Sequence, residues 1–256
     1  AARGRDRDRR EDHGPAAVEG GGHKGGGGAV AEGGSTERPH SLGAARWNEL
    51  DEAVTLLIPI GSCEQHGPHL PLDTDTQIAL EIAHRAAAHI DNCLVAPPIT
   101  ISASGEHQGF PGTLSIGNEA LTLSVIELCR SADWARRIVL VNGHGGNVGA
   151  ITTACRVLAA EGRPALDWWP TGSSTDLHAG RIETSVMLLI DPDQVDTASM
   201  ATGPTPSYAA LAEHGVQELS PTGVLGDPHG ATAEEGEEWL TKWTTDLVTA
   251  IRRDEP

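Results

Sequence analysis

Val54-Thr-Leu-Leu-Ile-Pro-Ile60 is a short, nearly continuous apolar run, and the polar loop Gly61-Ser-Cys-Glu-Gln-His-Gly-Pro-His-Leu-Pro-Leu-Asp-Thr-Asp75 follows it directly. Such a run is typical of a strand that is buried on both faces, as in parallel sheets. Strand and helix patterns then alternate as far as residue 169. The predicted strands are 54–60, 93–99, 137–142 and 165–169, and the predicted helices are 75–90, 118–134, 148–161, 181–190 and 232–253. This alternation predicts an α/β domain with a mostly parallel sheet and helices on both faces.

The charge of the chain argues against two classes of partner. Among its 256 residues are 18 Lys and Arg and 36 Asp and Glu, a net charge of −18. Residues 1–45 contain seven of each sign, so the whole excess lies on residues 46–256. Because affinity for phosphate comes from Lys and Arg, we expect no nucleic-acid partner and no anionic membrane partner. No run approaches the ~18 apolar residues of a membrane span.

The first 45 residues differ in composition from the rest of the chain. They hold 12 of the 31 glycines and almost no large apolar side chains. Such a segment cannot bury enough surface to offset its conformational entropy, so we expect disorder over 1–45 and one folded domain over 46–256. The four scattered cysteines form no CxxC pair and the N-terminus has no apolar stretch for secretion, which favours the reduced cytoplasm.

The loop after the first strand contains five potential metal ligands within twelve residues: Glu64, His66, His69, Asp73 and Asp75. In open α/β sheets, ligands bind where the strands end at their carboxyl edge. A Glu and a His two residues apart on an extended segment point in the same direction. Together with another carboxylate they form a nitrogen and oxygen set that suits Zn, Fe(II) or Mn. For any one residue a helix cap or a solvated turn is the simpler explanation, but five together favour a metal site.

A second polar segment, Asn142-Gly-His144-Gly-Gly-Asn147, lies between a predicted strand and a predicted helix. It is not a GxGxxG motif and no Lys-Ser/Thr follows, so a phosphate loop is disfavoured. Its glycines allow a tight turn, and His144 stands where the end of the strand would meet the first loop. The alternative is a glycine-rich turn with an incidental histidine.

Two further segments carry candidate catalytic residues. In Asp176-Leu-His178-Ala-Gly-Arg-Ile-Glu183, a helix that starts near Gly180 would point His178 and Glu183 into one cleft. The alternative is that Glu183 only caps that helix. The second segment, residues 104–113, is loop-like. Its Glu106-His107 pair either lines the same cleft or forms a polar turn.

These segments, in this order, resemble the creatininase family of creatinine amidohydrolases and their relatives. The matching motifs are Glu64-Gln-His-Gly-Pro-His-Leu-Pro71, Gly105-Glu-His-Gln-Gly-Phe-Pro-Gly-Thr113, Asn142-Gly-His-Gly-Gly-Asn147 and His178-Ala-Gly-Arg-Ile-Glu-Thr-Ser185. The resemblance spans about residues 50–250. It implies a three-layer α/β/α fold and a homo-oligomer. Segments 129–137, 141–150 and 220–236 are similar to the mycofactocin branch of the family, whose members resemble peptidases that release a C-terminal dipeptide from a modified precursor peptide.

The resemblance also implies a centre with two divalent metal ions, Fe2+ or Zn2+ or else Mn2+. Glu64 and His144 would hold one ion, His66 would hold the other, and Asp75 would bridge them. Creatininases have a glutamate ligand two residues after the histidine of the Asn-Gly-His turn, where this chain has Gly146. Glu183 resembles the carboxylate that relatives with Gly-Gly in this turn use instead.

The implied reaction is hydrolysis of an amide or peptide C–N bond by metal-activated water. The catalytic candidates are His178, Glu183, Glu106 and His107. His178 would move protons to the leaving amine, and Glu106 and His107 would orient the substrate or line the rim. Two alternatives stay open: a small-molecule amidohydrolase of the creatinine or formamide type on the same site, and a metal-binding scaffold subunit without activity.

Overall fold

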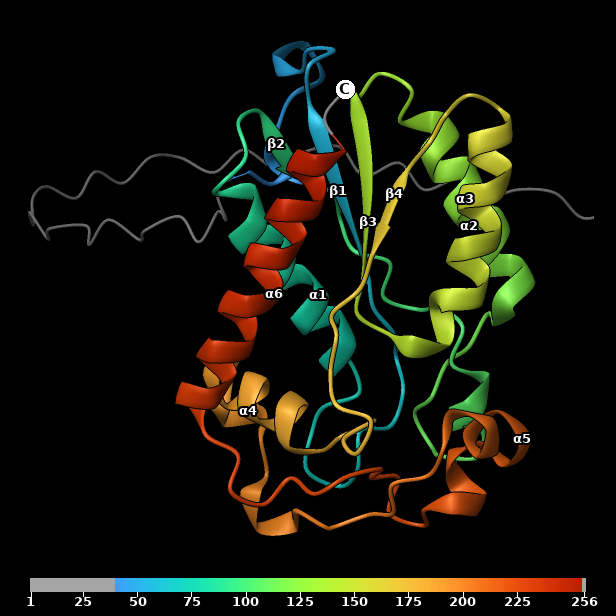
Figure 1. Ribbon diagram of the computed structural model, residues 1–256, viewed down its shortest axis with the longest axis vertical. Helices are drawn as coiled ribbons and strands as arrows, with labels where there is room; N and C mark the ends of the chain where they lie inside the picture. Colours follow the sequence, from blue (N-terminus) through green and yellow to red (C-terminus); the bar gives the residue numbers. More distant parts are fainter. Residues whose placement is uncertain (1–39, 255–256) are drawn as a thin grey trace, which may run out of the picture. The chain divides into compact units, whose positions relative to one another are not determined.

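The computed structural model describes residues 40–254, and at its centre is a parallel sheet of four strands (Figure 1). The strands are β1 Thr55–Ile60, β2 Cys93–Val95, β3 Arg137–Asn142 and β4 Leu166–Trp168, in the order β2-β1-β3-β4. The two central strands β1 and β3 are paired along their whole length, and all their residues are buried. Burial on both faces explains why their sequences are nearly continuous apolar runs. The predicted parallel sheet is confirmed.

Helices cover both faces of the sheet and give the implied three-layer α/β/α fold (Figure 1). The buried side chains of α1, α4 and α6 form one core with Leu57 and Val139, and those of α2 and α3 form the other with Leu56 and Leu140. Successive strand residues therefore enter opposite cores. The helices are α1 Thr74–Ala87, α2 Gly117–Ser131, α3 Val148–Ala160, α4 Arg181–Ile190, α5 Tyr208–Leu219 and α6 Ala233–Arg253.

Two elements differ from the expectation. Strand β2 ends at Val95 instead of residue 99, because Pro97 and Pro98 cannot donate ladder hydrogen bonds. Helix α5 was not predicted. Only Val216 of this helix is buried, and Gly215 interrupts it with a φ of 70°, so its sequence lacks a continuous apolar face.

The ordered chain begins earlier than predicted. His40 accepts a backbone hydrogen bond from Val95 through its carbonyl, Ser41 pairs with the same strand, and a short 3-10 helix spans Leu42–Ala44. The expectation of disorder up to residue 45 is therefore wrong for residues 40–45. Residues 1–39, like 255–256, lie outside the described part of the chain, so disorder there stays a prediction. No helix within residues 40–254 is long and apolar enough to cross a membrane.

The two central strands end side by side, and a glycine follows each of them. A Cβ on Gly61 would overlap the backbone of Thr76, and one on Gly143 would lie 2.5 Å from the carbonyl oxygen of Asp75. The missing side chains let the first turn of α1 approach the ends of β1 and β3 closely. The fold thereby places Asp75 at the carboxyl edge of the sheet, where α/β proteins bind their ligands.

Candidate metal centre

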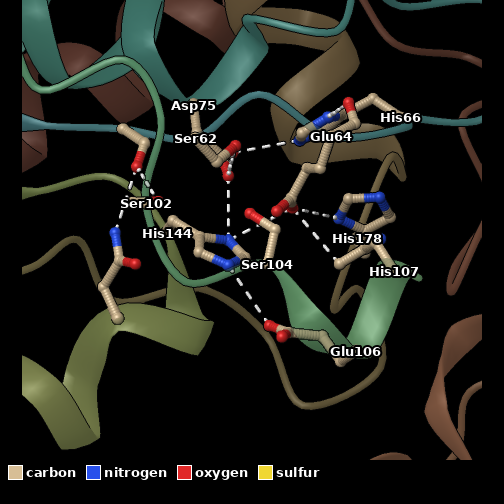
Figure 2. A network of polar contacts seen from close by, with 12 residues as sticks. Ser62, Glu64, His66, Asp75, Ser102, Ser104, Glu106, His107, His144 and His178 are labelled. Atoms are coloured by element: carbon tan, nitrogen blue, oxygen red, sulfur yellow. Dashed lines mark hydrogen bonds and ion pairs between the residues drawn. The ribbon is translucent and has the colours of Figure 1, made fainter. Parts of the chain in front are cut away.

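Four side chains from three elements meet at this edge of the sheet (Figure 2). The loop after β1 supplies Glu64 and His66, the first turn of α1 supplies Asp75, and the turn after β3 supplies His144. All four are buried. Asp75 lies between the two imidazoles, with Oδ1 3.0 Å from Nε2 of His66 and Oδ2 3.0 Å from Nδ1 of His144. One carboxylate thus faces two nitrogen donors, as a bridging ligand would.

The Glu64 carboxylate gives this cluster its most informative feature. Its exposed fraction is 0%, and neither oxygen has a hydrogen-bond partner within the described chain. Ring nitrogens of His144 and His107 lie 3.1 and 3.2 Å from Oε1, but without hydrogen-bond geometry. A buried carboxylate that lacks donors is destabilising unless a cation compensates it. The donor set therefore fits a divalent metal ion.

Three groups of ligand atoms have the spacing that a metal ion requires. In each group the atoms lie within 4.8 Å of one another. The groups are Glu64–His66–Asp75, Glu64–His107–His178 and His66–His178–Glu183. They share residues, so the described centre offers overlapping positions for cations.

The two histidines beside Asp75, His66 and His144, are protonated on both ring nitrogens, and so positively charged, at neutral pH in the metal-free protein. Burial alone would lower the pKa of His66, but the Asp75 carboxylate at 3.0 Å raises this pKa to about 9. Burial likewise opposes the charge on His144, and the neighbouring Glu64 and Asp75 raise the pKa of that imidazole well above its ordinary value. A metal ion would replace these protons, since histidine binds metals in its neutral form.

Glu106 lines the cavity beside this cluster and also contacts His144. Its Oε1 is 3.2 Å from Nε2 of His144, the nitrogen that also donates to the carbonyl oxygen of Ala103. Burial would raise the pKa of Glu106, but the contact with His144 holds this pKa below its usual range. A Cβ on Gly146 would overlap the Glu106 carboxylate. The space left by the glycine is therefore filled by a carboxylate from a different loop.

His107 and His178 lie on the other side of Glu64, in contact with each other (Figure 2). His107 is buried and lies in the wall of the cavity described below. Burial lowers the pKa of His107. The pKa of His178 lies well below its ordinary value, because this ring is also buried and because His66 and His107 are close to it. Both imidazoles are therefore neutral near pH 7 and each carries one ring proton.

Glu183 bonds to the backbone at the start of α4 and also lies within ligand spacing of two histidines. Helix α4 starts at Arg181, as predicted, and Oε2 of Glu183 accepts a hydrogen bond of 2.6 Å from the backbone N–H of Ala179, as a capping residue would. The same carboxylate belongs to the group with His66 and His178. Burial raises the pKa of Glu183 to about 7, despite the nearby imidazole of His66.

A cavity of about 1150 Å³ opens onto this cluster. Its inner wall includes Asp75 and His144. Its outer wall includes Trp169, which follows β4, and Tyr208 with other residues of helix α5. The volume exceeds the ~300–1,000 Å³ of typical small-ligand pockets. It is large enough for a peptide segment.

Sequence reasoning missed several residues that hold the cluster in place. The Ser62 hydroxyl donates to Asp75, and the Asn147 amide donates to the carbonyl of Gly61 and to the side chain of Asn142. Gln65 bonds to His107 and to Gly223. Gln65 and Asn147 are both uncharged members of the motifs quoted above, and their nearness in sequence to the ligand-type residues Glu64, His66 and His144 is the signal the sequence offered.

Comparison with known proteins fits this geometry. The family model described as creatininase, creatinine amidohydrolase, matches residues 44–251. The chain belongs to the creatininase family. It is 50% identical over 230 residues to the mycofactocin precursor peptide peptidase of Mycobacterium ulcerans, covering 84% of this chain and 92% of the relative. It is 46% identical to the protein of the same name from Mycolicibacterium smegmatis, covering 85% and 93% of the two chains. Membership of this family makes it a hydrolase of amide or peptide C–N bonds.

A solved structure confirms the family fold. The structure described as creatininase Mn superposes with a TM-score of 0.70 at 26% sequence identity, covering 85% of this chain and 99% of that one. That creatininase was solved with manganese, by its description. The α/β/α fold implied by the resemblance is confirmed by this match.

Proposed function

We propose that this protein is the metal-dependent peptidase of mycofactocin maturation, which releases the C-terminal dipeptide of the modified precursor peptide. The observation that carries the proposal is the wholly buried Glu64 carboxylate, without a hydrogen-bond donor, beside two histidines at a cavity of about 1150 Å³. Relatives of 46–50% identity bear the name of this peptidase. The size of the cavity favours a peptide over a single small ring.

The proposed centre would hold two divalent ions, Fe2+ or Zn2+ or else Mn2+. Glu64 and His144 would bind one ion and His66 the other, with Glu183 as its second carboxylate. Asp75 would be shared between them, since each of its oxygens already faces one imidazole. Glu106 and the Ala103 carbonyl hold the outer nitrogen of His144, which leaves Nδ1 directed toward Glu64 and Asp75.

When bound, such ions lower the pKa of water and polarise the scissile carbonyl. The side chains supply the remaining steps. His178 holds its proton on Nε2, where it donates to the Gln65 carbonyl at 2.7 Å, so Nδ1 is free to take up a proton and pass it to the leaving nitrogen. Its low pKa keeps it in the accepting form at neutral pH. Helix α5 and Trp169 would bind the peptide along the outer wall.

We place the active protein in the cytoplasm as a homo-oligomer. The four cysteines are free, as in a reducing compartment. Large apolar side chains are exposed at Leu114, Ile116 and Leu123, with Leu123 63% exposed, and would be covered in an assembly of several copies.

Mass spectrometry of the modified precursor peptide tests the proposal. The metal-free protein is loaded with Fe2+, Zn2+ or Mn2+ in turn, and its metal content is measured before the peptide is added. We expect release of the C-terminal dipeptide by the loaded protein and none by Glu64→Gln. Hydrolysis of creatinine or a formamide in place of the peptide would establish the small-molecule alternative. A loaded protein that hydrolyses no amide would establish the scaffold alternative.

A further inference from the structure

The side-chain amide of Gln65 is oriented by two backbone groups whose hydrogen-bonding roles are fixed. Its Oε1 accepts from the backbone N–H of Gly67 at 2.9 Å, and its Nε2 donates to the backbone carbonyl of Gly223 at 3.1 Å. An N–H cannot accept and a carbonyl cannot donate, so the amide has only one consistent orientation. Gly223 has a φ of +82°, and a Cβ there would overlap Oε1 of Gln65, so the turn that presents this carbonyl depends on glycine.

The second hydrogen on Nε2 of Gln65 has two candidate acceptors. Nδ1 of His107 lies 2.9 Å away and Nε2 of His178 lies 3.1 Å away. However, Nε2 of His178 is 2.7 Å from the backbone carbonyl of Gln65, a group to which it can only donate. That nitrogen carries a hydrogen and cannot accept another. The remaining hydrogen of the amide therefore goes to Nδ1 of His107.

We propose that Gln65 is a positioning residue that sets the tautomers of His107 and His178 and so gives the two histidines different tasks. His107 accepts on Nδ1, so its proton is on Nε2, which faces Oε1 of Glu64 at 3.2 Å. An N–H edge there stabilises the carboxylate, whereas a lone pair would repel it. His178 has its proton on Nε2 and a lone pair on Nδ1, which points toward Glu64 at 3.9 Å.

The two imidazoles, which are in van der Waals contact, would therefore have different chemical roles. Their ring centroids are 4.3 Å apart, yet only His178 offers a free lone pair toward the proposed metal ions and the substrate. His107 is excluded as a base or a metal ligand in this arrangement. The inference builds on the proposed metal centre, but the protons of the two rings can be observed without metal or substrate.

Solid-state NMR of the full-length, metal-free protein labelled with 15N-histidine tests the assignment. His107→Asn and His178→Asn identify the two sets of signals. We expect the wild-type spectrum to show a protonated Nε2 and an unprotonated Nδ1 in both rings. A wild-type spectrum with His107 protonated on Nδ1 would overturn the proposal without any variant of Gln65.

Substitution of Gln65 adds a second, independent readout. Gln65→Glu replaces the donor to His107 with an acceptor, so a proton should appear on Nδ1 of His107 while His178 keeps its proton on Nε2, because its partner is a backbone carbonyl. Gln65→Met keeps the shape but removes the donor, so His107 should show both tautomers in the same spectra while His178 keeps its single tautomer. Gln77→Met, which removes only the bond to exposed Asp73, is the matched control.

Failure of the tautomer assignment and failure of the proposed function give different results. An unchanged His107 ring in Gln65→Met or in Gln65→Glu would overturn the role of Gln65 whatever the substrate proves to be. Failure to cleave the precursor peptide, with both NMR results as expected, would overturn the proposed function and leave this inference standing.

Discussion

At the scale of single residues, the cluster combines buried carboxylates with imidazoles that are positively charged in the metal-free protein. Glu64 has no aligned hydrogen-bond donor, although ring nitrogens of His144 and His107 lie 3.1 and 3.2 Å from its Oε1. Asp75 is shared between His66 and His144. Buried charges of this kind are stable only with a partner of opposite sign. Measuring the stability of the metal-free protein therefore tests these side chains separately from catalysis.

Glu64→Gln should lose the stabilisation that Zn2+ gives the wild type. In EDTA, removal of the buried charge and loss of its attraction to protonated His144 act in opposite directions, so the two melting temperatures should lie close together. With Zn2+ the wild type alone gains the binding energy of the ion and should melt at a higher temperature; ~1 kcal/mol corresponds to about 2–4 °C in a domain of this size. Glu213→Gln, on the exposed side of α5, is the control. An equal gain from Zn2+ in Glu64→Gln and in the wild type would contradict the role of Glu64 as a ligand.

The effect of Glu183→Gln on the stability of the metal-free protein should depend on pH. The pKa of Glu183 is raised to about 7 from an ordinary 4.5, so the folded metal-free protein binds this proton more tightly than the unfolded chain. The stability that this proton contributes is complete below about pH 4.5 and is lost as the pH rises through 7. In EDTA the variant should therefore match the wild type near pH 5 and exceed it near pH 8 in urea denaturation.

Metal analysis of the same variant distinguishes the two roles of Glu183. As a ligand, its loss should leave one tightly bound ion per chain and reduce hydrolysis by orders of magnitude. As a cap for Ala179 only, it should leave two ions and normal turnover, because the side-chain oxygen of Gln can still accept from the Ala179 N–H.

At the scale of elements, the centre depends on how closely α1 approaches the ends of β1 and β3. Three segments that are distant in sequence contribute ligands, so a small displacement of the helix would separate Asp75 from both histidines. The closest approach is at Gly61, where a side chain would meet the backbone of Thr76. Backbone atoms of a buried helix cannot move aside as a flexible side chain can.

Gly61→Ala should therefore lower the free energy of unfolding by roughly 1–3 kcal/mol and weaken Zn2+ binding as well. Gly149→Ala, in the first turn of α3, meets no atom within 4 Å and should stabilise the protein by ~0.5–1 kcal/mol through helix propensity. Urea denaturation in EDTA measures the first effect, and chelator competition measures the second. Equal stability of the two variants would contradict the close approach of α1.

At the scale of the whole molecule, we expect a boundary near residue 40 between the segment that the fold requires and the segment that it does not. The resemblance begins near residue 50 and the family model at residue 44, but the first contacts with the sheet are made by His40 and Ser41. Composition placed the boundary at residue 45, because residues 40–45 have no apolar pattern that would predict a strand or a helix. Their contribution is a backbone hydrogen bond and a bridge to β2.

Two truncations test this boundary. Deletion of residues 1–39 should leave the melting temperature, metal content and turnover unchanged. Deletion of residues 1–45 should also remove the hydrogen bond between Val95 and His40 and the pairing of Ser41, and should destabilise the protein by about 1–3 kcal/mol, since each lost hydrogen bond contributes ~0.5–1.5 kcal/mol. Identical melting temperatures for the two truncations would show that residues 40–45 contribute nothing to the fold.

The sequence by itself determined the elements that have strong local patterns. The runs 54–60 and 137–142 predicted the central strands, and helix α4 was predicted at its observed bounds. Glu64, His66, Asp75 and His144 were singled out because ligand-type residues gathered in glycine-rich loops at strand ends. Helix α5 was not predictable in this way, since it buries one side chain and contains a residue of positive φ.

Only the tertiary structure decided which partner each of these side chains has. Residues 106 and 146 are 40 positions apart, so no local pattern could show that the Glu106 carboxylate fills the space beside Gly146. The proposed tautomer of His107 depends on a backbone carbonyl at Gly223, which orients the Gln65 amide and lies more than 100 positions from it along the chain. Hydrogen bonds and overlaps of this kind depend on distances of a few tenths of an ångström between distant segments, and only the packed chain fixes such distances.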